Sequence, residues 1–241
     1  MEKWVLSIDV GKLIINRTRL KMIKVDGGTF HMGAQSEFPN STNYDVEAYP
    51  SEGPVHSVTL SDYYIGETEV TIELWETVMG GDISNDKDSL KPIGAVSYND
   101  CIDFLIQLNK YTGKDFRLPT EAEFEYASRG GKKMYPTKFS GANNIDHVAW
   151  CNDTVSHEVK RKDGNELELY DMSGNVWEWC HDWYGDYENC DMTNPEGPLN
   201  GKYRVLRGGS WRNDPKQCRV SYRGRNYPTQ NNINYGFRLA L

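Results

Sequence analysis

The chain has 241 residues, enough for one sizeable hydrophobic core or two small ones, and we expect one main domain. Hydrophobic residues make up 38% and aromatic residues 12%, while 22 glycines and 10 prolines indicate many loops; this profile disfavours a helical bundle or a disordered chain. The net charge of −8 argues against a general nucleic-acid binder, although the segment from Arg204 onward carries seven arginines and one lysine against the single acid Asp214.

The sequence gives no indication of a membrane segment. No run approaches the roughly 20 apolar residues that span a bilayer, and the stretch MEKWVLSIDVGKLIIN lacks the features of a signal peptide, so we expect a cytoplasmic protein. The cysteines form no CxxC pair and predict neither a zinc site nor a complete disulfide framework. Cys180 and Cys190 could cross-link a loop in an oxidising compartment, but free thiols are the simpler expectation; the five are Cys101, Cys151, Cys180, Cys190 and Cys218.

Strand patterns dominate the N-terminal third. Residues 1–21 read as a hairpin arm ahead of a main domain of residues 22–241, because Trp4, Leu6, Ile8 and Val10 alternate with other residues and apolar residues resume at 13–15. The stretch MIKVDGGTFHMGA predicts two short strands around a glycine turn. Residues 34–54 are expected to form a polar surface loop, and HSVTLSDYYIGETEVT restores strand character.

Two helices follow in the chain. The first begins near Thr71. The second begins around Ser97 or Asn99 and ends before Gly113, and its apolar residues recur at spacings of three and four. Cys101 lies on that apolar face, so we expect it in the core.

A third helix begins after Thr120, which forms a capping box with Glu123, and it closes at Gly130-Gly131. Residues 131–241 show no helix period, only short strands separated by loops. The sequence therefore predicts an α+β fold with little regular secondary structure.

The segment LYDMSGNVWEWCHDWYG, residues 169–185, has the highest density of distinctive residues. Its three tryptophans are large, rigid core anchors. Asp171 and Glu178 flank a tight turn, and this mixture of carboxylates and nearby carbonyls is what calcium favours. Alternatively, the two acids satisfy buried backbone donors or pair with arginines.

Four motifs in order resemble the formylglycine-generating enzyme family, the sulfatase-modifying factors: DGGTFHMG, RLPTEAEFEYASRGG, LYDMSGNVWEW and RGGSW followed by YGFRLA. The resemblance covers about residues 22–241 and implies one domain related to C-type lectins and held by structural calcium. It implies a calcium site formed by Asp171, Glu178 and the carbonyls of Gly174 and Val176. The family's second calcium site has no clear counterpart in residues 145–165.

The same resemblance bears on catalysis. It implies an oxidase that converts a sulfatase cysteine to formylglycine with oxygen and a cuprous ion held by two thiolates. Counted from Ser210, the two thiolate positions are Asn213 and Cys218, so one thiol is missing and we do not expect copper. The sequence shows no base partner for Ser210, which is therefore expected to be a hydrogen-bonding residue.

The leading hypothesis is a ligand-binding module. The alternative is a formylglycine-generating or related oxygen-dependent oxidase, with Cys218 and Ser210 as catalytic candidates.

The C-terminal segment supplies candidate residues for binding a protein or peptide. Arginine and aromatic side chains are enriched at binding hot spots, although we expect about half of this set to pair internally or join the core. Asparagines between the GGSW and GFR borders are similar to the changeable positions of retroelement-diversified variable proteins. The ligand-binding candidates are Trp211, Arg212, Asn213, Arg219, Tyr222, Arg223, Arg225, Tyr227 and Asn231.

Overall fold

A four-stranded antiparallel sheet opens the chain. In this computed structural model, which describes residues 7–9, 12–15, 18–81 and 88–241, the sheet order is β1-β2-β3-β6. Its strands are β1 (Ser7–Asp9), β2 (Lys12–Ile15), β3 (Thr18–Val25) and β6 (Tyr63–Gly66). The β1–β2 pair forms a hairpin whose second strand pairs with β3, and β3 continues into the core at Leu20, Met22 and Val25. Trp4, Leu6 and Val10 of the predicted arm lie outside the described residues.

A second sheet follows the glycine turn. Strand β4 (Gly28–Met32) pairs antiparallel with β5 (His56–Leu60), which pairs in parallel with β8 (Met192–Thr193). Gly27 is required at the turn, because a Cβ there would lie 2.3 Å from the carbonyl oxygen of Leu60. Between β4 and β5, the chain forms the predicted loop, which includes a short 3-10 turn, Pro50–Glu52.

The third sheet contains the tryptophan-rich segment. Its order is β10-β9-β7-β11, with β7 (Trp177–Trp183), β9 (Arg204–Arg207), β10 (Gly224–Asn226) and β11 (Tyr235–Gly236). Trp177 and Trp179 are buried, and the Trp179 indole Nε1 donates to the carbonyl of Val96 at 3.0 Å. The predicted tryptophan anchors thus lie at the centre of this sheet, except that Trp183 is only half-buried.

The three predicted helices are confirmed. Helix α1 (Ile72–Met79) is capped by Thr71, and α2 (Tyr98–Thr112) is capped by Ser97 and ends at a left-handed Gly113. Helix α3 (Glu121–Ser128) has the capping box between Thr120 and Glu123. A one-turn helix, α4 (Ile145–Val148), was not predicted, because four residues are too few to show a period. Short 3-10 turns follow at Gly131–Lys133 and Pro215–Cys218.

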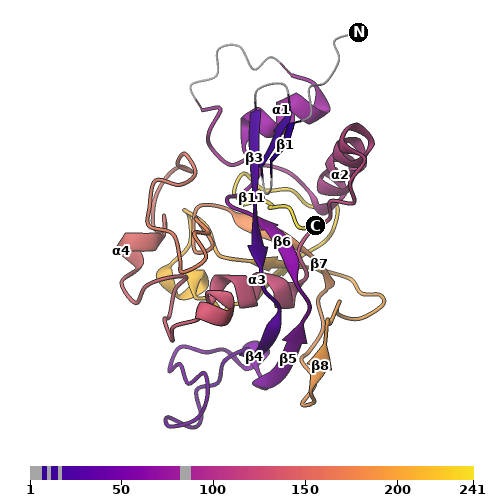
Figure 1. Ribbon diagram of the computed structural model, residues 1–241. Coiled ribbons are helices and arrows are strands. Elements are labelled where there is room, and N and C mark those ends of the chain that lie inside the picture. Colours follow the sequence, from indigo (N-terminus) through magenta and orange to yellow (C-terminus); the bar gives the residue numbers. More distant parts are fainter. Residues whose placement is uncertain (1–6, 10–11, 16–17, 82–87) are drawn as a thin grey trace.

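Figure 1 shows α1 and α2 near one end of the molecule, the β4–β5–β8 sheet at the opposite end and α3 between them. One apolar cluster packs α1 and α2 against β3, β7 and the C-terminal segment, and a second surrounds α3 and strands β4, β5 and β6. The predicted α+β fold with few helices is confirmed. In the part of the chain that the structure describes, no helix has the length and apolar character to cross a membrane.

Candidate functional site

The GGS turn after β9 brings the C-terminal motif residues together. Gly208 and Gly209 have φ angles of 90° and 76°, in the left-handed region that favours glycine. A Cβ on Gly209 would lie 2.6 Å from the sulfur of Cys218, so this glycine lets the turn lie directly on that thiol. The backbone N–H of Trp211 then donates to the carbonyl of Asn175 at 2.8 Å, which fixes the turn against the residues that precede β7.

Ser210 is the centre of a buried hydrogen-bond network. Its hydroxyl donates to Oδ1 of Asn213 and accepts from Nδ2 of Asn234 at 2.7 Å, and the amide of Asn213 donates to Gln217 at 2.7 Å. These side-chain partners include no base, which agrees with the hydrogen-bonding role expected for Ser210. Since both ends of the Asn213 amide are engaged in this network and it supplies no sulfur, Asn213 and Cys218 do not fit a cuprous ion held by two thiolates.

Cys218 nevertheless has a second thiol beside it. Cys218 is fully buried among Phe139, Val148 and Ala149, and Cys151 packs against the same cluster. The hydrogen bond between the two thiols lowers the pKa of Cys151, whereas that bond and burial raise the pKa of Cys218 well above its usual range. This pair was not predicted, because nothing in the spacing relates the segment after α4 to the GGS turn.

The predicted calcium residues lie in an unusually acidic buried region. Oδ1 of Asp171 is buried without a hydrogen-bond partner, and burial raises the pKa of Asp171 to about 6. Glu69 was not predicted to lie there; burial, with the charges of Asp171 and Glu178, raises its pKa well above the usual range. The three carboxylates face the single guanidinium of Arg238, which pairs with Glu178.

Part of the donor set at this site is of the kind that calcium binds. The unpartnered Asp171 oxygen and the carbonyls of Gly174 and Val176 are oxygen ligands. Both Glu178 oxygens, by contrast, accept from Arg238 at 2.6 Å, which is the pairing with an arginine that the alternative interpretation expected. No three His, Cys, Asp or Glu side chains within the described ranges form a metal-ligand cluster, but a site completed by backbone carbonyls needs only two. Gly174 has φ of 85°, and a Cβ there would lie 2.4 Å from the Trp150 carbonyl oxygen.

Three of the predicted ligand-binding residues are buried within the fold. Arg219 pairs with Glu52 through two guanidinium nitrogens and also contacts Asp45 at 3.1 Å. Arg223 pairs with Glu121 at 2.7 and 2.8 Å. Trp211 is also buried, and Tyr222 is half-buried. Trp211, Arg219 and Arg223 therefore pack or pair within the fold.

The exposed predicted residues Arg225 and Tyr227 belong to a surface cluster that we call the aromatic–cationic face, formed by Tyr184, Lys202, Tyr203, Arg225 and Tyr227. Lys202 Nζ lies 5.3 Å from the Tyr203 ring centre and 5.4 Å from that of Tyr227. The Arg225 guanidinium lies 4.6 Å from the Tyr184 ring and 5.1 Å from the Tyr203 ring. The rings of Tyr203 and Tyr227 are 4.7 Å apart.

This face arises from strand pairing. Strand β10 pairs antiparallel with β9, with Asn226 opposite Arg204, and this register brings Tyr227 beside Tyr203. The sequence did not reveal Tyr184, Lys202 or Tyr203, because the register of two short strands cannot be read from their spacing. The other exposed candidates, Arg212 and Asn231, lie outside this cluster.

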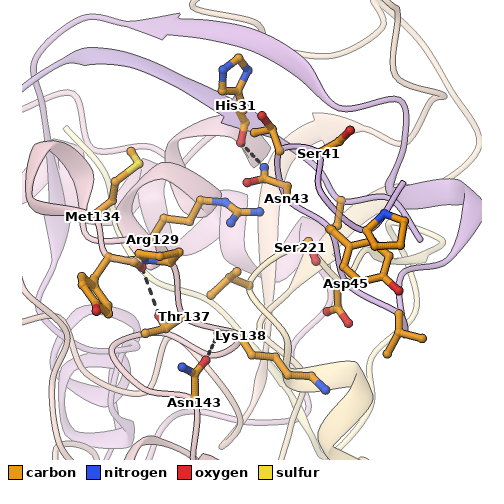
Figure 2. A pocket seen from close by; sticks show the side chains of 18 residues that line it. His31, Ser41, Asn43, Asp45, Arg129, Met134, Thr137, Lys138, Asn143 and Ser221 are labelled. Atoms are coloured by element: carbon orange, nitrogen blue, oxygen red, sulfur yellow. Dashed lines mark hydrogen bonds between the residues drawn. The ribbon is translucent and has the colours of Figure 1, made fainter. Parts of the chain in front are cut away.

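A cavity of about 620 Å³ lies elsewhere, between the loop of residues 34–46 and residues 129–143. Figure 2 shows Arg129, Asn43, Asp45 and Lys138 around it. These polar groups are engaged within the fold: Arg129 pairs with Glu125, and Asn43 donates to the carbonyl of His31 at 2.6 Å. This cavity was not predicted, because the composition of residues 34–54 indicates only a polar loop.

The family of the chain is shown by comparison with known proteins. The family model of the sulfatase-modifying factor enzyme 1-like domain matches residues 15–241. The chain is 32% identical to the chaperone protein LppX of Paenibacillus barcinonensis, over 70% of this chain and 76% of LppX. It is 29% identical to the formylglycine-generating enzyme of Streptomyces coelicolor, over 93% of this chain and 90% of that enzyme.

Among solved structures, Treponema denticola variable protein 1 has a TM-score of 0.84 with 29% identity, and the match covers 97% of this chain and 99% of that protein. Other relatives are much longer: the chain spans 38% of the serine/threonine-protein kinase Pkn1 of Chlamydia trachomatis, at 31% identity over 91% of its own length.

Proposed function

The chain belongs to the sulfatase-modifying factor family, as its motifs indicated, and we propose that within this family it is a binding module for a protein or peptide ligand. The aromatic–cationic face is the observation that carries the proposal. It combines two exposed cations with the exposed ring of Tyr227 and the half-buried rings of Tyr184 and Tyr203, and arginine and tyrosine are enriched at binding hot spots. Neither Lys202 nor Arg225 forms an ion pair within the described part of the chain, so both charges are free to meet a ligand.

The chemistry of the face favours an acidic ligand. The chain as a whole carries a net charge of −8, yet this face presents two cations. A peptide with carboxylates beside an aromatic or apolar side chain would meet both features at once. Position 213 further supports a binding role, because the Asn213 amide occupies a place where the resemblance implies a copper ligand.

A selection experiment tests this proposal. Random displayed peptides are selected against the full chain, and the affinity of each selected peptide is then measured on variants. We expect acidic peptides, with affinity reduced at least about tenfold by Arg225→Ala or Tyr227→Ala. The controls are Arg161→Ala, an exposed arginine on another surface, and Tyr135→Ala at the cavity. Failure to select any peptide, or loss of affinity only in Tyr135→Ala, contradicts the proposed face.

A formylglycine-generating oxidase is the second candidate, because the Cys218 thiol is hydrogen-bonded to another thiol, that of Cys151, although from a different segment than the resemblance implies. The full chain is supplied anaerobically with one equivalent of Cu(I) and then given oxygen and a CxPxR peptide. Aldehyde formation that Cys218→Ser abolishes supports this second function. Absence of aldehyde supports the binding module.

Two further features belong to the proposal. The first is a structural calcium ion at Asp171 and Glu178, held together with the carbonyls of Gly174 and Val176. The second is diversification of the segment between the GGSW and GFR borders, which the similarity to Treponema denticola variable protein 1 supports. A reverse transcriptase gene with a template repeat beside the gene for this chain is the expected genomic signature; its absence contradicts diversification.

A further inference from the structure

Two segments far apart in the sequence hold Cys151 against Cys218. The N–H of Asn152 donates to the carbonyl of Asn213 at 3.0 Å, and the N–H of Asp153 donates to the carbonyl of Trp211 at 2.7 Å. The two acceptor carbonyls flank Arg212, and the bonds hold the segment after α4, which includes Cys151, against the GGS turn. On the other side, Gly209 lies directly on the Cys218 sulfur. The contact between the thiols is therefore built by backbone geometry on both segments.

We infer that Cys151 and Cys218 form a reversible dithiol–disulfide site that reacts with small-molecule disulfides, with Cys151 as the attacking thiol and Cys218 as the resolving thiol. The burial of the two residues assigns these roles. Cys151 is half-buried and therefore partly accessible to a small reagent, whereas Cys218 is fully buried. The inference does not depend on the proposed binding function.

The electrostatics of the pair agree with this assignment. The thiol of Cys218 donates a hydrogen bond that favours the thiolate of Cys151 and lowers its pKa, and the thiolate is the nucleophile in disulfide exchange. The other cysteines lack this combination. Burial raises the pKa of Cys101 and of Cys180 well above the usual range. Cys190 is exposed, but desolvation and the nearby Glu188 carboxylate raise its pKa.

The reaction balances without any bound cofactor. The Cys151 thiolate attacks one sulfur of a disulfide RSSR, the S–S bond breaks and RS⁻ leaves, so Cys151 carries a mixed disulfide. Cys218 then gives its proton to the leaving thiolate and attacks the Cys151 sulfur, and a second RS⁻ departs and is protonated. The protein pair loses two electrons and two protons, and one RSSR becomes two RSH. The two sulfurs must close from contact to the bonded distance of about 2.05 Å.

The test uses the full chain and glutathione disulfide. Non-reducing peptide mapping should recover a peptide pair joined through Cys151 and Cys218, with the mass lowered by two hydrogen atoms and restored by dithiothreitol. Cys190→Ser should leave this product unchanged. Cys218→Ala should instead leave glutathione attached to Cys151, because the resolving thiol is gone. Oxidation should also raise the melting temperature of the wild type but not of Cys151→Ser, since the bridge closes a long loop.

Alkylation of the unmutated chain gives an independent result should Cys218→Ala fail to fold. Near neutral pH, iodoacetamide should label the half-buried Cys151 at least about threefold faster than the exposed Cys190, because the thiolate is the reacting form. If exposure alone governed reactivity, Cys190 would be labelled faster than Cys151, and this result would overturn the inference. The inference is also overturned if glutathione disulfide modifies Cys190 of the folded wild-type chain while Cys151 and Cys218 both remain available for alkylation.

Discussion

Glu178 and Arg238 form an ion pair in which two guanidinium nitrogens donate to the two carboxylate oxygens, each at 2.6 Å, and both side chains are fully buried. This guanidinium also interacts electrostatically with Asp171 and Glu69. The Arg238 guanidinium therefore lies near three buried acids while one Asp171 oxygen has no hydrogen-bond partner, and this unpartnered oxygen is the physical basis of the calcium proposal.

Removal of calcium should lower the melting temperature. A ligand present at a hundred times its dissociation constant stabilises the folded state by about 2.7 kcal/mol, which corresponds to a shift of roughly 5–10 °C for a chain of this size. Asp171→Asn should abolish the calcium-dependent shift, whereas Asp163→Asn, at an exposed position nearby, should retain it. Calorimetry with a chelator and with added calcium measures both, and an identical transition in the two conditions counts against the site.

Breaking the buried pair between Arg219 and Glu52 should strongly destabilise the chain. Arg219→Met leaves the Glu52 carboxylate buried without its partner, and we expect a loss of about 3–5 kcal/mol in the free energy of unfolding. The double variant with Glu52→Gln should lose less than the sum of the two single variants. Urea unfolding gives the comparison, with the exposed Arg212→Met as control. A change of under about 0.5 kcal/mol in Arg219→Met would mean that the pair does not stabilise the fold.

The stability of the chain should depend on pH through Asp182. Burial, and then the charge of Glu121, raises the pKa of Asp182 to about 8, although its carboxylate accepts from the N–H of Glu121 at 2.8 Å. The folded state then binds a proton that the unfolded state releases near pH 4, so this group costs stability progressively as the pH rises toward 8.

Asp182→Asn mimics the protonated acid and removes this dependence. The free energy of unfolding of the variant minus that of the wild type should increase by roughly 3 kcal/mol as the pH rises from about 5 to about 8. Chemical unfolding at several pH values measures the gain. A difference between the two proteins that is constant with pH would show that Asp182 is ionised in the folded state.

Gly209→Ala should be more harmful than Gly113→Ala. Both glycines have positive φ angles, 76° and 65°, so alanine costs about 1–2 kcal/mol of backbone strain at either position. Only at Gly209 would the added Cβ meet the Cys218 sulfur at 2.6 Å and the Gln217 carbonyl oxygen at 2.7 Å; at Gly113 nothing lies within 4 Å. Thermal unfolding should rank the variants in this order, and equal losses would show that the GGS turn shifts freely.

Local signals were sufficient for the three longer helices and for the family. Thr71, Ser97 and Thr120 each begin a helix, because a hydroxyl at the N-cap acts on backbone only two or three residues away. The four motifs were likewise enough to recognise the family that the comparisons show. The one-turn helix α4 escaped detection because its signal is shorter than one period.

The order of residues along the chain is enough to show that Asn213 stands where the resemblance implies a thiol, and that cations and rings concentrate near the C-terminus. Which of these cations are free depends on the folded chain: it buries Arg219 and Arg223 in ion pairs and leaves Arg225 beside Tyr203 and Tyr184. It also decided that Cys151 meets Cys218. The physical reason is that such contacts depend on strand register and on backbone hydrogen bonds between distant loops, which leave no periodic trace along the chain.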